Sequence, residues 1–509
     1  MCWRLSIQGT HYCFVLCGQT TAVVVVLTLV AVKFAAMVIK KRYKLPPGPR
    51  GLPLLGYLPF FGKEPPVTFT EMRKTYGDVI SISMGSWAAI VINGRDVIRE
   101  ALVTKGDDFS GRPAFTTARL LNEGKNFAFS QFGVIWRMHR KIFVNVMYTF
   151  TNIRHNPIEN IIRSEASTVI EEFLAHGDKP FCPLTSLEVA GSSLVYQLCY
   201  GAQKNIREDA DFMKVLNGAR KFQKFSGTGN PVDVMPWLRY FMPSKISTFL
   251  EFTRGAAARR TRKVEEHEAT FDKNHLRDIT DGLIHAGNTL SPEERAVGLD
   301  KQRVVETLDT VFGAGGSTAT SVFQWGVYLM SAYPEVQEKV FQQIDKVVGQ
   351  DRVVALSDRA DLALVEATIY EVLRFSGPVP FALPHTTTRD TTLQGYDIPE
   401  GTVVIVNLHS IFADEDLWGD PKTFRPERFL TSEGELDRGL VEQVAAFSLG
   451  RRRCPGEFLA RMELFLFFAT LMQRLKFWRP PGQPENAFES EFSLTHDIKP
   501  FEVCVSPRD

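Results

Sequence analysis

Apolar residues recur three and four positions apart over most of the chain after residue 65, which is the spacing of one helix face. The clearest helical stretches are 302–330, 335–348, 364–375 and 457–475. Strand-like runs are shorter and fewer, at 79–84, 88–92 and 403–407, and residues 395–401 carry turn signals. The pattern therefore predicts a mainly α-helical protein with a minor β-sheet.

The first 44 residues have a different pattern. Residues 12–32 contain no charged side chain, and roughly 20 apolar residues suffice to cross a bilayer. Lys33 interrupts the apolar run, but its long side chain can extend the amine to the lipid surface. Residues 40–44 have the basic sequence Lys-Lys-Arg-Tyr-Lys. A cleaved signal peptide is the alternative, but its basic cluster would precede the apolar run. We predict a membrane anchor with a basic stop over 1–44 and a cytosolic remainder.

A proline-rich connector follows at 45–50, with the sequence Leu-Pro-Pro-Gly-Pro-Arg. Proline fixes φ and removes a backbone donor, so we expect a stiff, non-helical hinge that orients the body against the membrane. Because no later linker, repeat or low-complexity tract occurs, we expect one catalytic body over 51–509.

Composition narrows the class of protein. The 58 acidic and 59 basic residues nearly cancel, so nothing global favours binding to nucleic acid. Phenylalanine is abundant, with 38 residues against 12 tyrosines and 7 tryptophans, which suits a large apolar interior or an apolar pocket. The seven cysteines are scattered without zinc spacing, which favours a reducing compartment without a disulfide framework.

One of these cysteines, Cys454, lies in a distinctive loop, Phe-Ser-Leu-Gly-Arg-Arg-Arg-Cys-Pro-Gly over 447–456. The two glycines allow a tight turn and the close approach of a flat ligand, and Pro455 suits the first turn of a helix. The helix N-terminus and the arginines should favour the thiolate. Such a thiolate can be a nucleophile or a metal ligand, and a structural cysteine is the plain alternative.

The loop resembles the haem-binding loop of the cytochromes P-450, F-x-x-G-x-R-x-C-x-G, with its positions filled by Phe447, Gly450, Arg452, Cys454 and Gly456. The resemblance implies the P-450 fold with an N-terminal transmembrane helix. It also implies haem b as cofactor and Cys454 as the iron ligand. In that family the thiolate pushes electron density toward cleavage of the O–O bond.

Further motifs follow in the family's order. Trp136-x-x-x-Arg140 resembles the helix that reaches a haem propionate, and His385 and Arg452 fit further propionate partners. Glu371-x-x-Arg374 and Pro-Glu-Arg-Phe over 426–429 are also similar to family motifs. Arg428 would complete a Glu371–Arg374–Arg428 ion cluster, which we interpret as structural. Residues 229–233, 276–281 and 384–390 favour the aryl hydrocarbon hydroxylase side of the microsomal branch over the steroid 17α-hydroxylase side.

The stretch Phe-Gly-Ala-Gly-Gly-Ser-Thr over 312–318 resembles the oxygen-binding groove, with Thr318 bonding the oxygen. Three glycines in a helix cost about 1 kcal/mol each, so we expect a local widening. Where the family usually has an acid this chain has Ser317, and Thr310 replaces a second acid. Asp309 lies about 100° away from Thr310 round the helix. Serine holds no charge, so we expect slower or less coupled oxygen activation through Ser317.

The resemblance implies a substrate pocket built from separated stretches that together favour a flat, apolar guest. Polycyclic aromatics, steroids and polyunsaturated lipids all fit this description, and for any single phenylalanine plain core packing is an equally good interpretation. The expected lining residues are Phe115, Phe127, Phe129, Phe222, Phe225, Ala314, Thr318, Val379, Phe381, Leu494 and Thr495.

No G-x-G-x-x-G follows a strand, so we do not expect NADPH to bind this chain. The resemblance implies electrons from NADPH-cytochrome P-450 reductase, and a basic docking face can be built from Arg137, Lys141, Arg451 and Arg453. Ordinary solvated charges are the alternative.

Together these features predict a haem-thiolate monooxygenase of the endoplasmic reticulum membrane. One rival is a haem-thiolate isomerase or dehydratase that rearranges a peroxide without NADPH. The other is a non-catalytic haem or lipid sensor.

Overall fold

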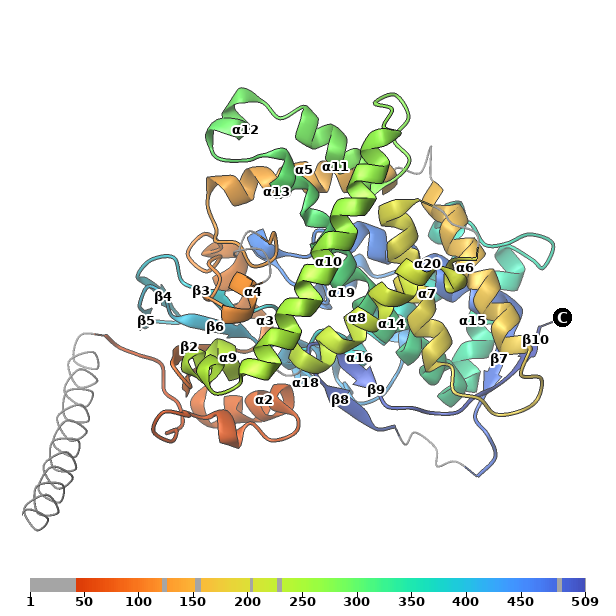
Figure 1. Ribbon diagram of the computed structural model, residues 1–509. Helices are drawn as coiled ribbons and strands as arrows, with labels where there is room; N and C mark the ends of the chain where they lie inside the picture. Colours follow the sequence, from red (N-terminus) through yellow and green to blue (C-terminus); the bar gives the residue numbers. More distant parts are fainter. Residues whose placement is uncertain are drawn as a thin grey trace, which may run out of the picture.

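The computed structural model describes residues 43–120, 126–151, 157–201, 205–226, 231–482 and 488–508. The predicted anchor therefore lies outside the described residues, except for Tyr43 and Lys44. Among the described residues, no helix is long and apolar enough to cross a membrane. Helices make up most of the structure and a small sheet lies at one side, as the hydrophobic pattern predicted (Figure 1).

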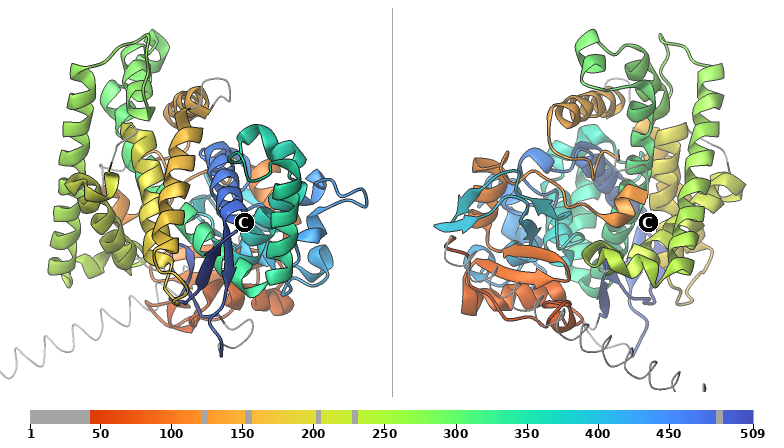
Figure 2. Two further views of the ribbon diagram at one scale, coloured as in Figure 1. Left: turned by 90° about the vertical axis from the view of Figure 1, so that its right-hand side faces the viewer. Right: turned by 60° about the vertical axis from the view of Figure 1, so that its left-hand side comes forward.

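Eleven of the described helices have ten or more residues and form the bulk of the molecule. They are α2 (Pro65–Tyr76), α5 (Val134–Thr151), α6 (Pro157–Leu174), α7 (Leu184–Tyr200), α8 (Ala210–Ser226), α10 (Pro243–Ala269), α11 (Ile279–Asn288), α14 (Thr307–Ala332), α15 (Pro334–Val347), α16 (Ala363–Ser376) and α20 (Glu457–Arg474). The left view of Figure 2 shows them in succession, from α10 in light green at one edge, past α7, to α15 in teal.

Short helical segments connect these elements. They are α3 (Arg95–Arg99), α4 (Thr116–Leu120), α9 (Pro231–Val234), α12 (Pro292–Ala296), α13 (Lys301–Val305), α17 (His409–Phe412), α18 (Glu415–Trp418), α19 (Arg438–Gln443), η1 (Leu58–Phe60), the π-turn η2 (Glu100–Thr104), η4 (Ile206–Glu208), η5 (Pro236–Tyr240), η6 (Leu356–Asp361), η7 (Pro426–Phe429) and η8 (Gly450–Arg452).

The main sheet has the order β1-β2-β6-β3, from β1 (Val79–Met84), β2 (Trp87–Ile92), β6 (Val403–Val406) and β3 (His385–Thr386). β2 pairs antiparallel with β1 and parallel with β6. Three hydrogen-bonded pairs complete the β structure: β4 (Thr391–Leu393) with β5 (Tyr396–Ile398), β7 (Leu475–Trp478) with β10 (Cys504–Pro507), and β8 (Ser490–Phe492) with β9 (His496–Ile498).

Two sequence predictions of local structure were right only in part. The helix expected over 302–330 is interrupted once, because Glu306 turns between α13, which ends at Val305, and α14, which begins at Thr307. The turn signals over 395–401 were right for Gly395, Glu400 and Gly401, which lie in turns, but Tyr396–Ile398 between them form the strand β5. Only Gln394 and Gly395 form the two-residue turn of the β4–β5 hairpin, and both have positive φ, 50° and 74°. Such φ values match the tight hairpin turns in which glycine is favoured.

The expected widening of α14 was wrong, because the helix is α-helical over its whole length. Its glycines have a packing reason instead. A Cβ on Gly315 would lie 3.0 Å from Val195 Cγ2 and one on Gly316 would lie 3.4 Å from Ser192 Cα, so both positions face α7. The missing side chains let the two helix backbones approach closely, which offsets the low helix propensity of glycine.

The proline-rich connector lies against the body. The Lys44 backbone N–H donates to Asp397 Oδ2 (2.7 Å), and the Asp397 N–H donates to the Lys44 carbonyl (2.9 Å). The Ser81 N–H donates to the Pro47 carbonyl (2.8 Å). Residues 43–50 are therefore held against β1 and the β4–β5 hairpin, which fixes the direction in which the chain leaves toward its N-terminus.

Candidate functional site

The cysteine loop is held by backbone geometry that only glycine allows at one position. The Cys454 N–H donates to the Phe447 carbonyl (2.9 Å), which closes the loop before α20. Gly450 has φ +73°, and a Cβ there would lie 1.8 Å from the Leu102 carbonyl oxygen. The loop can approach η2 this closely only because position 450 carries no side chain.

Burial raises the pKa of the Cys454 thiol, against the sequence expectation of a favoured thiolate. The Gly456 N–H, Arg140 and Arg453 do act to lower that pKa, but the desolvation penalty is larger. The local charges alone therefore do not hold the thiolate. Coordination to a metal cation stabilises a thiolate in such a place, which fits a ligand role better than that of a free nucleophile.

Beside the loop lies a buried cluster of cationic side chains. Arg452 donates from Nε to the Ser110 carbonyl (3.0 Å) and from Nη2 to the Ser130 carbonyl (2.7 Å), while its Nη1 is buried without a hydrogen-bond partner. Burial, and next Arg112 and Arg140, lower the pKa of Arg452 to about 8. An orphaned guanidinium nitrogen in a positive environment indicates a site for an anion.

Trp136 serves this cluster as a platform. The Arg452 guanidinium lies 4.1 Å from the centroid of its ring, and the Arg140 guanidinium lies 5.5 Å away. The indole N–H donates to the Phe127 carbonyl (3.2 Å). Trp136 therefore positions two guanidinium groups by cation–π contact, while its own donor is used within the protein.

Sequence reasoning missed Arg112, which completes the cluster. Its side chain is buried and donates to the carbonyls of Ala128, Leu383 and Pro384 at 2.9–3.0 Å. Burial lowers its pKa to about 9. No continuous motif marks this residue, because its partners lie far away in the sequence. His385 Nδ1–H donates to the Phe109 carbonyl (2.6 Å), and burial holds the pKa of that imidazole well below its ordinary value.

Within the described part of the chain, Arg112, Arg140 and Arg452 have no carboxylate within ion-pair distance. Buried charges without counter-charges are costly. Three guanidinium groups beside a cysteine loop would be satisfied by a ligand that carries two carboxylates and a metal. Haem would fit this requirement: the guanidinium groups would hold its propionates and Cys454 would ligate its iron.

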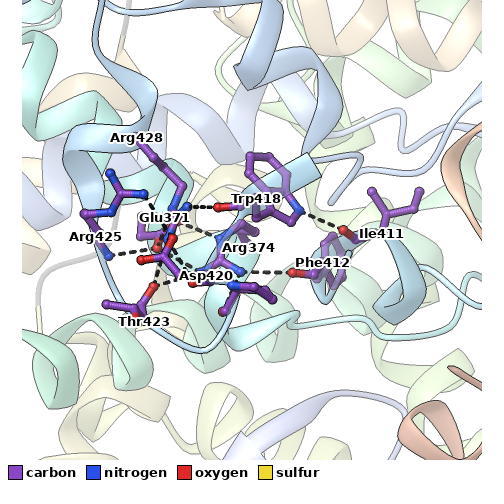
Figure 3. A network of polar contacts seen from close by, with 10 residues as sticks. Glu371, Arg374, Ile411, Phe412, Trp418, Asp420, Thr423, Arg425 and Arg428 are labelled. Carbon is purple, nitrogen blue, oxygen red and sulfur yellow. Dashed lines mark hydrogen bonds and ion pairs between the residues drawn. The ribbon is translucent and has the colours of Figure 1, made fainter. Parts of the chain in front are cut away.

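The predicted ion cluster of Glu371, Arg374 and Arg428 forms, as Figure 3 shows. Glu371 accepts from Arg374 Nε (2.7 Å) and Nη2 (2.8 Å), and from Arg428 Nε (3.1 Å). Both arginines also donate to backbone carbonyls, Arg374 to Phe412 and Arg428 to Trp418. The network ties α16 to η7, and because its members are buried and mutually bonded it fits a structural role.

α14 presents an uncovered stretch in the middle of the helix. Gly313 and Ala314 are exposed, whereas Ala319 to Ser331 are buried. The Thr318 hydroxyl donates to the Ala314 carbonyl (2.8 Å), and Ser317 is partly exposed. Asp309 forms an ion pair with Arg260 of α10, so it is engaged away from this stretch.

Two of the expected pocket residues come together as aromatic rings. Phe115 lies 5.5 Å from Phe129 and 5.5 Å from Trp87, in edge-on contacts between ring centroids. Phe127 is instead stacked on Trp136, at 6.0 Å, within the main core. Phe127 therefore fits the alternative of core packing.

The remaining expected pocket residues lie in two regions, and Val379 belongs with the hairpin residues because the His496 N–H, next to Thr495, donates to the Pro378 carbonyl (3.0 Å). Phe381 packs toward Phe69 (5.9 Å) in the small core beside the sheet, and Val379 is partly buried. Leu494 is 47% exposed and Thr495 is 2% exposed, both in the turn of the β8–β9 hairpin. Two further expected pocket residues, Phe222 and Phe225, belong to α8, and their side chains are outside the described part of the structure.

The expected basic face is less positive than its sequence indicates. Arg137 and Arg451 both pair with Asp107, at 2.9 and 3.0 Å, and Arg453 pairs with Glu457 at 3.0 Å. Lys141 is exposed. Exposed ion pairs contribute little to stability and open readily, so the arginines remain accessible to an acidic partner.

A mainly helical fold, a cysteine loop closed by glycine and a buried cationic cluster define a haem-thiolate protein. The cytochrome P450 family matches residues 46–505, and the chain belongs to that family. It is 39% identical over 456 residues to cytochrome P450 1A1 of Mesocricetus auratus, covering 87% of each chain. It is 36% identical over 473 residues to cytochrome P450 1A1 of Cavia porcellus, covering 91% of each.

Cytochrome P450 1A1 of Homo sapiens is 37% identical over 456 residues, which cover 87% of this chain and 88% of the human protein. Such matches over nearly the whole chain identify a P450 monooxygenase, an oxidoreductase that incorporates oxygen from O2. Its cofactor is haem with a thiolate ligand.

Proposed function

We propose that this monooxygenase acts on a flat, apolar substrate, with electrons from NADPH supplied by a membrane-bound flavoprotein reductase. The observation that carries the proposal is the uncovered stretch at Gly313 and Ala314, in a helix that is otherwise largely buried. Glycine and alanine present no bulk there, and a planar ring system can lie against such a surface. Haem supplies the oxygen chemistry when bound, and this stretch offers the substrate a place beside it.

Aromatic side chains support the substrate class. Trp87, Phe115 and Phe129 form a continuous run of edge-on rings between β2 and the segment before α5. Such rings recognise aromatic guests by edge and face contacts rather than by charge. The similarity to cytochromes P450 1A1 supports a place in xenobiotic metabolism, and polycyclic aromatics are therefore the first substrates to test.

Membrane attachment has a second line of support besides the apolar run at 12–32. Seven exposed apolar side chains, here called the apolar edge, lie on two segments: Leu52, Leu54, Leu55, Phe60, Trp237, Tyr240 and Phe241. Both segments contact the β1–β2 turn, because Gly85 N–H donates to the Leu55 carbonyl (3.1 Å) and Ser86 N–H to the Val234 carbonyl (2.8 Å). Exposed apolar side chains gathered on segments around one turn are typical of a surface that binds a membrane or another protein.

The proposed electron route uses the face around the cysteine loop. Arg137 and Arg451 can exchange Asp107 for an acidic group of the reductase, and Lys141 adds an exposed positive charge. Charge complementarity of this kind accelerates docking and makes it salt-dependent. We expect reduction of the protein to slow as ionic strength rises.

The experiment is the ratio of oxygenated product to NADPH consumed, in membranes that contain the haem-loaded protein and the reductase. Pyrene, a steroid and a polyunsaturated fatty acid are compared. A ratio near one for pyrene supports the proposal. If only the steroid or the fatty acid is oxygenated, the substrate class is wrong. Rearrangement of a lipid hydroperoxide without NADPH consumption would favour the isomerase instead, and haem binding without any turnover would favour a sensor.

A further inference from the structure

The β8–β9 hairpin is bonded to α14 one turn beyond Thr318. Ser321 donates from its hydroxyl to the His496 carbonyl (3.0 Å), and the Trp325 indole N–H donates to the same oxygen (2.9 Å). Ser321 is 1% exposed. The helix that carries the uncovered stretch is thereby fixed to a hairpin whose next residue is an acid, Asp497.

The Asp497 side chain faces this junction. Its Oδ2 accepts from the Thr495 hydroxyl (2.7 Å), and the carboxyl is also hydrogen-bonded to the Ser321 side chain. The Ser321 hydroxyl therefore has two partners, the His496 carbonyl and the Asp497 carboxyl. Because a hydroxyl can both donate and accept, it can also take a proton from that carboxyl when the carboxyl is protonated.

The charges around Asp497 also favour its protonated form. Burial raises the pKa of this carboxyl, and Glu491 of β8 and Glu188 of α7 raise it further. The hydrogen bonds from Thr495 and Ser321 act in the opposite direction and are outweighed. A carboxyl of this kind can hold a proton inside the protein and release it on demand.

Helix spacing connects Asp497 to the uncovered stretch. Ser321 follows Thr318 by three residues and Ser317 by four, so all three hydroxyls lie on neighbouring positions of one face. Thr318 in turn bonds the carbonyl of Ala314. Asp309 lies nine residues before Thr318, about 180° round the helix, and is paired with Arg260.

We propose that Asp497 is the internal proton donor of the reaction, acting through the hydroxyls of Ser321, Thr318 and Ser317. Monooxygenation converts O2, a substrate C–H, two electrons and two protons into a C–OH and one water. The electrons come from NADPH through the reductase, so the inference rests on the proposed function. Each proton that leaves the carboxyl is replaced from solvent at the exposed end of the hairpin. Asp497 acts through Ser321 and is a relay residue, not a catalytic one.

The test compares Asp497→Asn, which keeps the shape but loses the ionisable proton, with Glu489→Gln, a matched loss of an exposed carboxyl at the start of the same hairpin that pairs with Lys499. Pyrene product and hydrogen peroxide are measured per NADPH in reductase-containing membranes. We expect product per NADPH to fall on the order of tenfold or more in Asp497→Asn, with peroxide rising in its place. Glu489→Gln should behave as the parent. Equal coupling in Asp497→Asn and the parent would overturn the relay.

A rescue variant separates proton supply from hairpin packing. In the Asp497→Asn background, Ser317→Asp places a carboxyl directly beside Thr318, and we expect it to restore product per NADPH. In the parent, the same Ser317→Asp change should alter little, because Asp497 already supplies the proton. If Asp497 supplies the proton, Ser317 in place of the family's usual acid no longer predicts slow oxygen activation. Failure of the rescue, with haem fully incorporated, would count against the relay.

Cumene hydroperoxide gives a second control, because R′OOH and RH yield R′OH and ROH without added protons or electrons. Asp497→Asn should keep the parent rate in this assay. A loss equal to that with NADPH would instead indicate a damaged fold. If the parent works only with the hydroperoxide, the proposed electron route fails and the relay is judged by spectroscopy.

Infrared spectroscopy supplies that independent measurement. At neutral pH the carbonyl band of protonated carboxylic acids should be larger in the parent and in Glu489→Gln than in Asp497→Asn, where a band from Glu463 remains because burial raises its pKa to about 8. Because a raised pKa means that the proton is retained until the pH exceeds that value, the difference between the parent and Asp497→Asn should disappear as the pH is raised. Identical bands in the parent and Asp497→Asn at neutral pH would overturn the proposal.

Discussion

At the scale of single residues, the guanidinium cluster makes a prediction about the ligand itself. Haem dimethyl ester keeps the iron and the ring but carries no propionate charge. We expect its affinity for the apoprotein to fall on the order of 10²-fold or more, because each buried cation then loses its counter-charge. Titration of apoprotein with both ligands, followed by absorption, measures the difference.

Variants of single arginines show which residue accounts for the loss of haem affinity. Arg452→Gln should weaken the binding of haem much more than the binding of its ester, since Arg452 Nη1 is the orphaned atom. Arg451→Gln is the matched control, because the neighbouring side chain is exposed and paired with Asp107, and it should leave both affinities unchanged. Equal affinities of haem and ester for the unmodified chain would contradict an anion-binding role for the cluster.

The sequence predicted those site residues that stand together in one stretch of the chain. Cys454, Gly450 and Arg452 occupy one uninterrupted stretch, and local rules on thiolates and glycines already mark it. Arg112 and Asp497 stand in no motif, since their chemistry arises from contacts with Pro384 and Ser321, which are distant in the chain. The raised pKa of Cys454 was missed because desolvation depends on packing that a sequence does not display.

At the scale of elements, two glycines with positive φ form a natural comparison. Gly450→Ala places a Cβ 1.8 Å from the Leu102 carbonyl, whereas Gly434, at φ +81°, has nothing within 4 Å of that position. We expect Gly434→Ala to cost about 1–2 kcal/mol of backbone strain and Gly450→Ala at least about 3 kcal/mol. Thermal unfolding and haem retention of the two variants measure this; similar losses in both would show that the contact with η2 does not matter.

A histidine at the end of α10 links that helix to α11. His267 Nδ1 faces the Lys263 carbonyl (2.7 Å) and Nε2 faces Asp278 Oδ2 (3.0 Å), so both nitrogens donate when the ring is protonated. Asp281 is held by Arg277 through both oxygens, at 2.6 and 2.8 Å. The group of His267, Asp278 and Asp281 is therefore an ionic link whose polar atoms are already engaged.

This link predicts a pH-dependent stability. Burial opposes the charge on His267, but Asp278, the Lys263 carbonyl and Asp281 outweigh it, so its pKa is raised above the ordinary 6.5. A raised folded-state pKa gives stability that is fully present below the unfolded value and lost as the pH rises through the folded one. The Tm difference between the parent and His267→Gln should therefore shrink from about pH 5 to about pH 9. A constant difference would mean that the ring is neutral throughout.

Helix positions were predictable because each long helix carries its own apolar face, which local spacing reveals. The break at Glu306 could not be predicted, because it is a backbone turn within a continuous apolar pattern. The close packing of α14 on α7 could not be predicted either, because it depends on which helix lies opposite Gly315 and Gly316. A glycine within a helix indicates that the position has a structural role, but only the neighbouring element shows what that role is.

At the scale of the whole molecule, the connector and the apolar edge both bear on the proposed membrane attachment. Residues 43–50 lie against β1 and the β4–β5 hairpin, so a body tethered through them would have a restricted orientation. The two segments of the apolar edge come to the β1–β2 turn, where the Gly85 N–H donates to the Leu55 carbonyl and the Ser86 N–H donates to the Val234 carbonyl. The two contacts together would set one orientation on the bilayer.

We therefore expect a chain that begins at residue 43 to keep affinity for vesicles of neutral phospholipid, because the apolar edge alone inserts. Replacing Leu54, Tyr240 and Phe241 by serine should reduce vesicle partitioning on the order of 10²-fold, since burying each such side chain contributes about 1.5–3 kcal/mol when complete. Tyr148 and Phe458, also exposed but located together on α5 and α20, provide the matched control, and their serine variants should partition as the parent does. Co-sedimentation measures all three proteins. An equal loss in both the triple and the control variants would show general surface hydrophobicity rather than a defined membrane-binding edge, and only the predicted anchor would then remain as a proposed attachment.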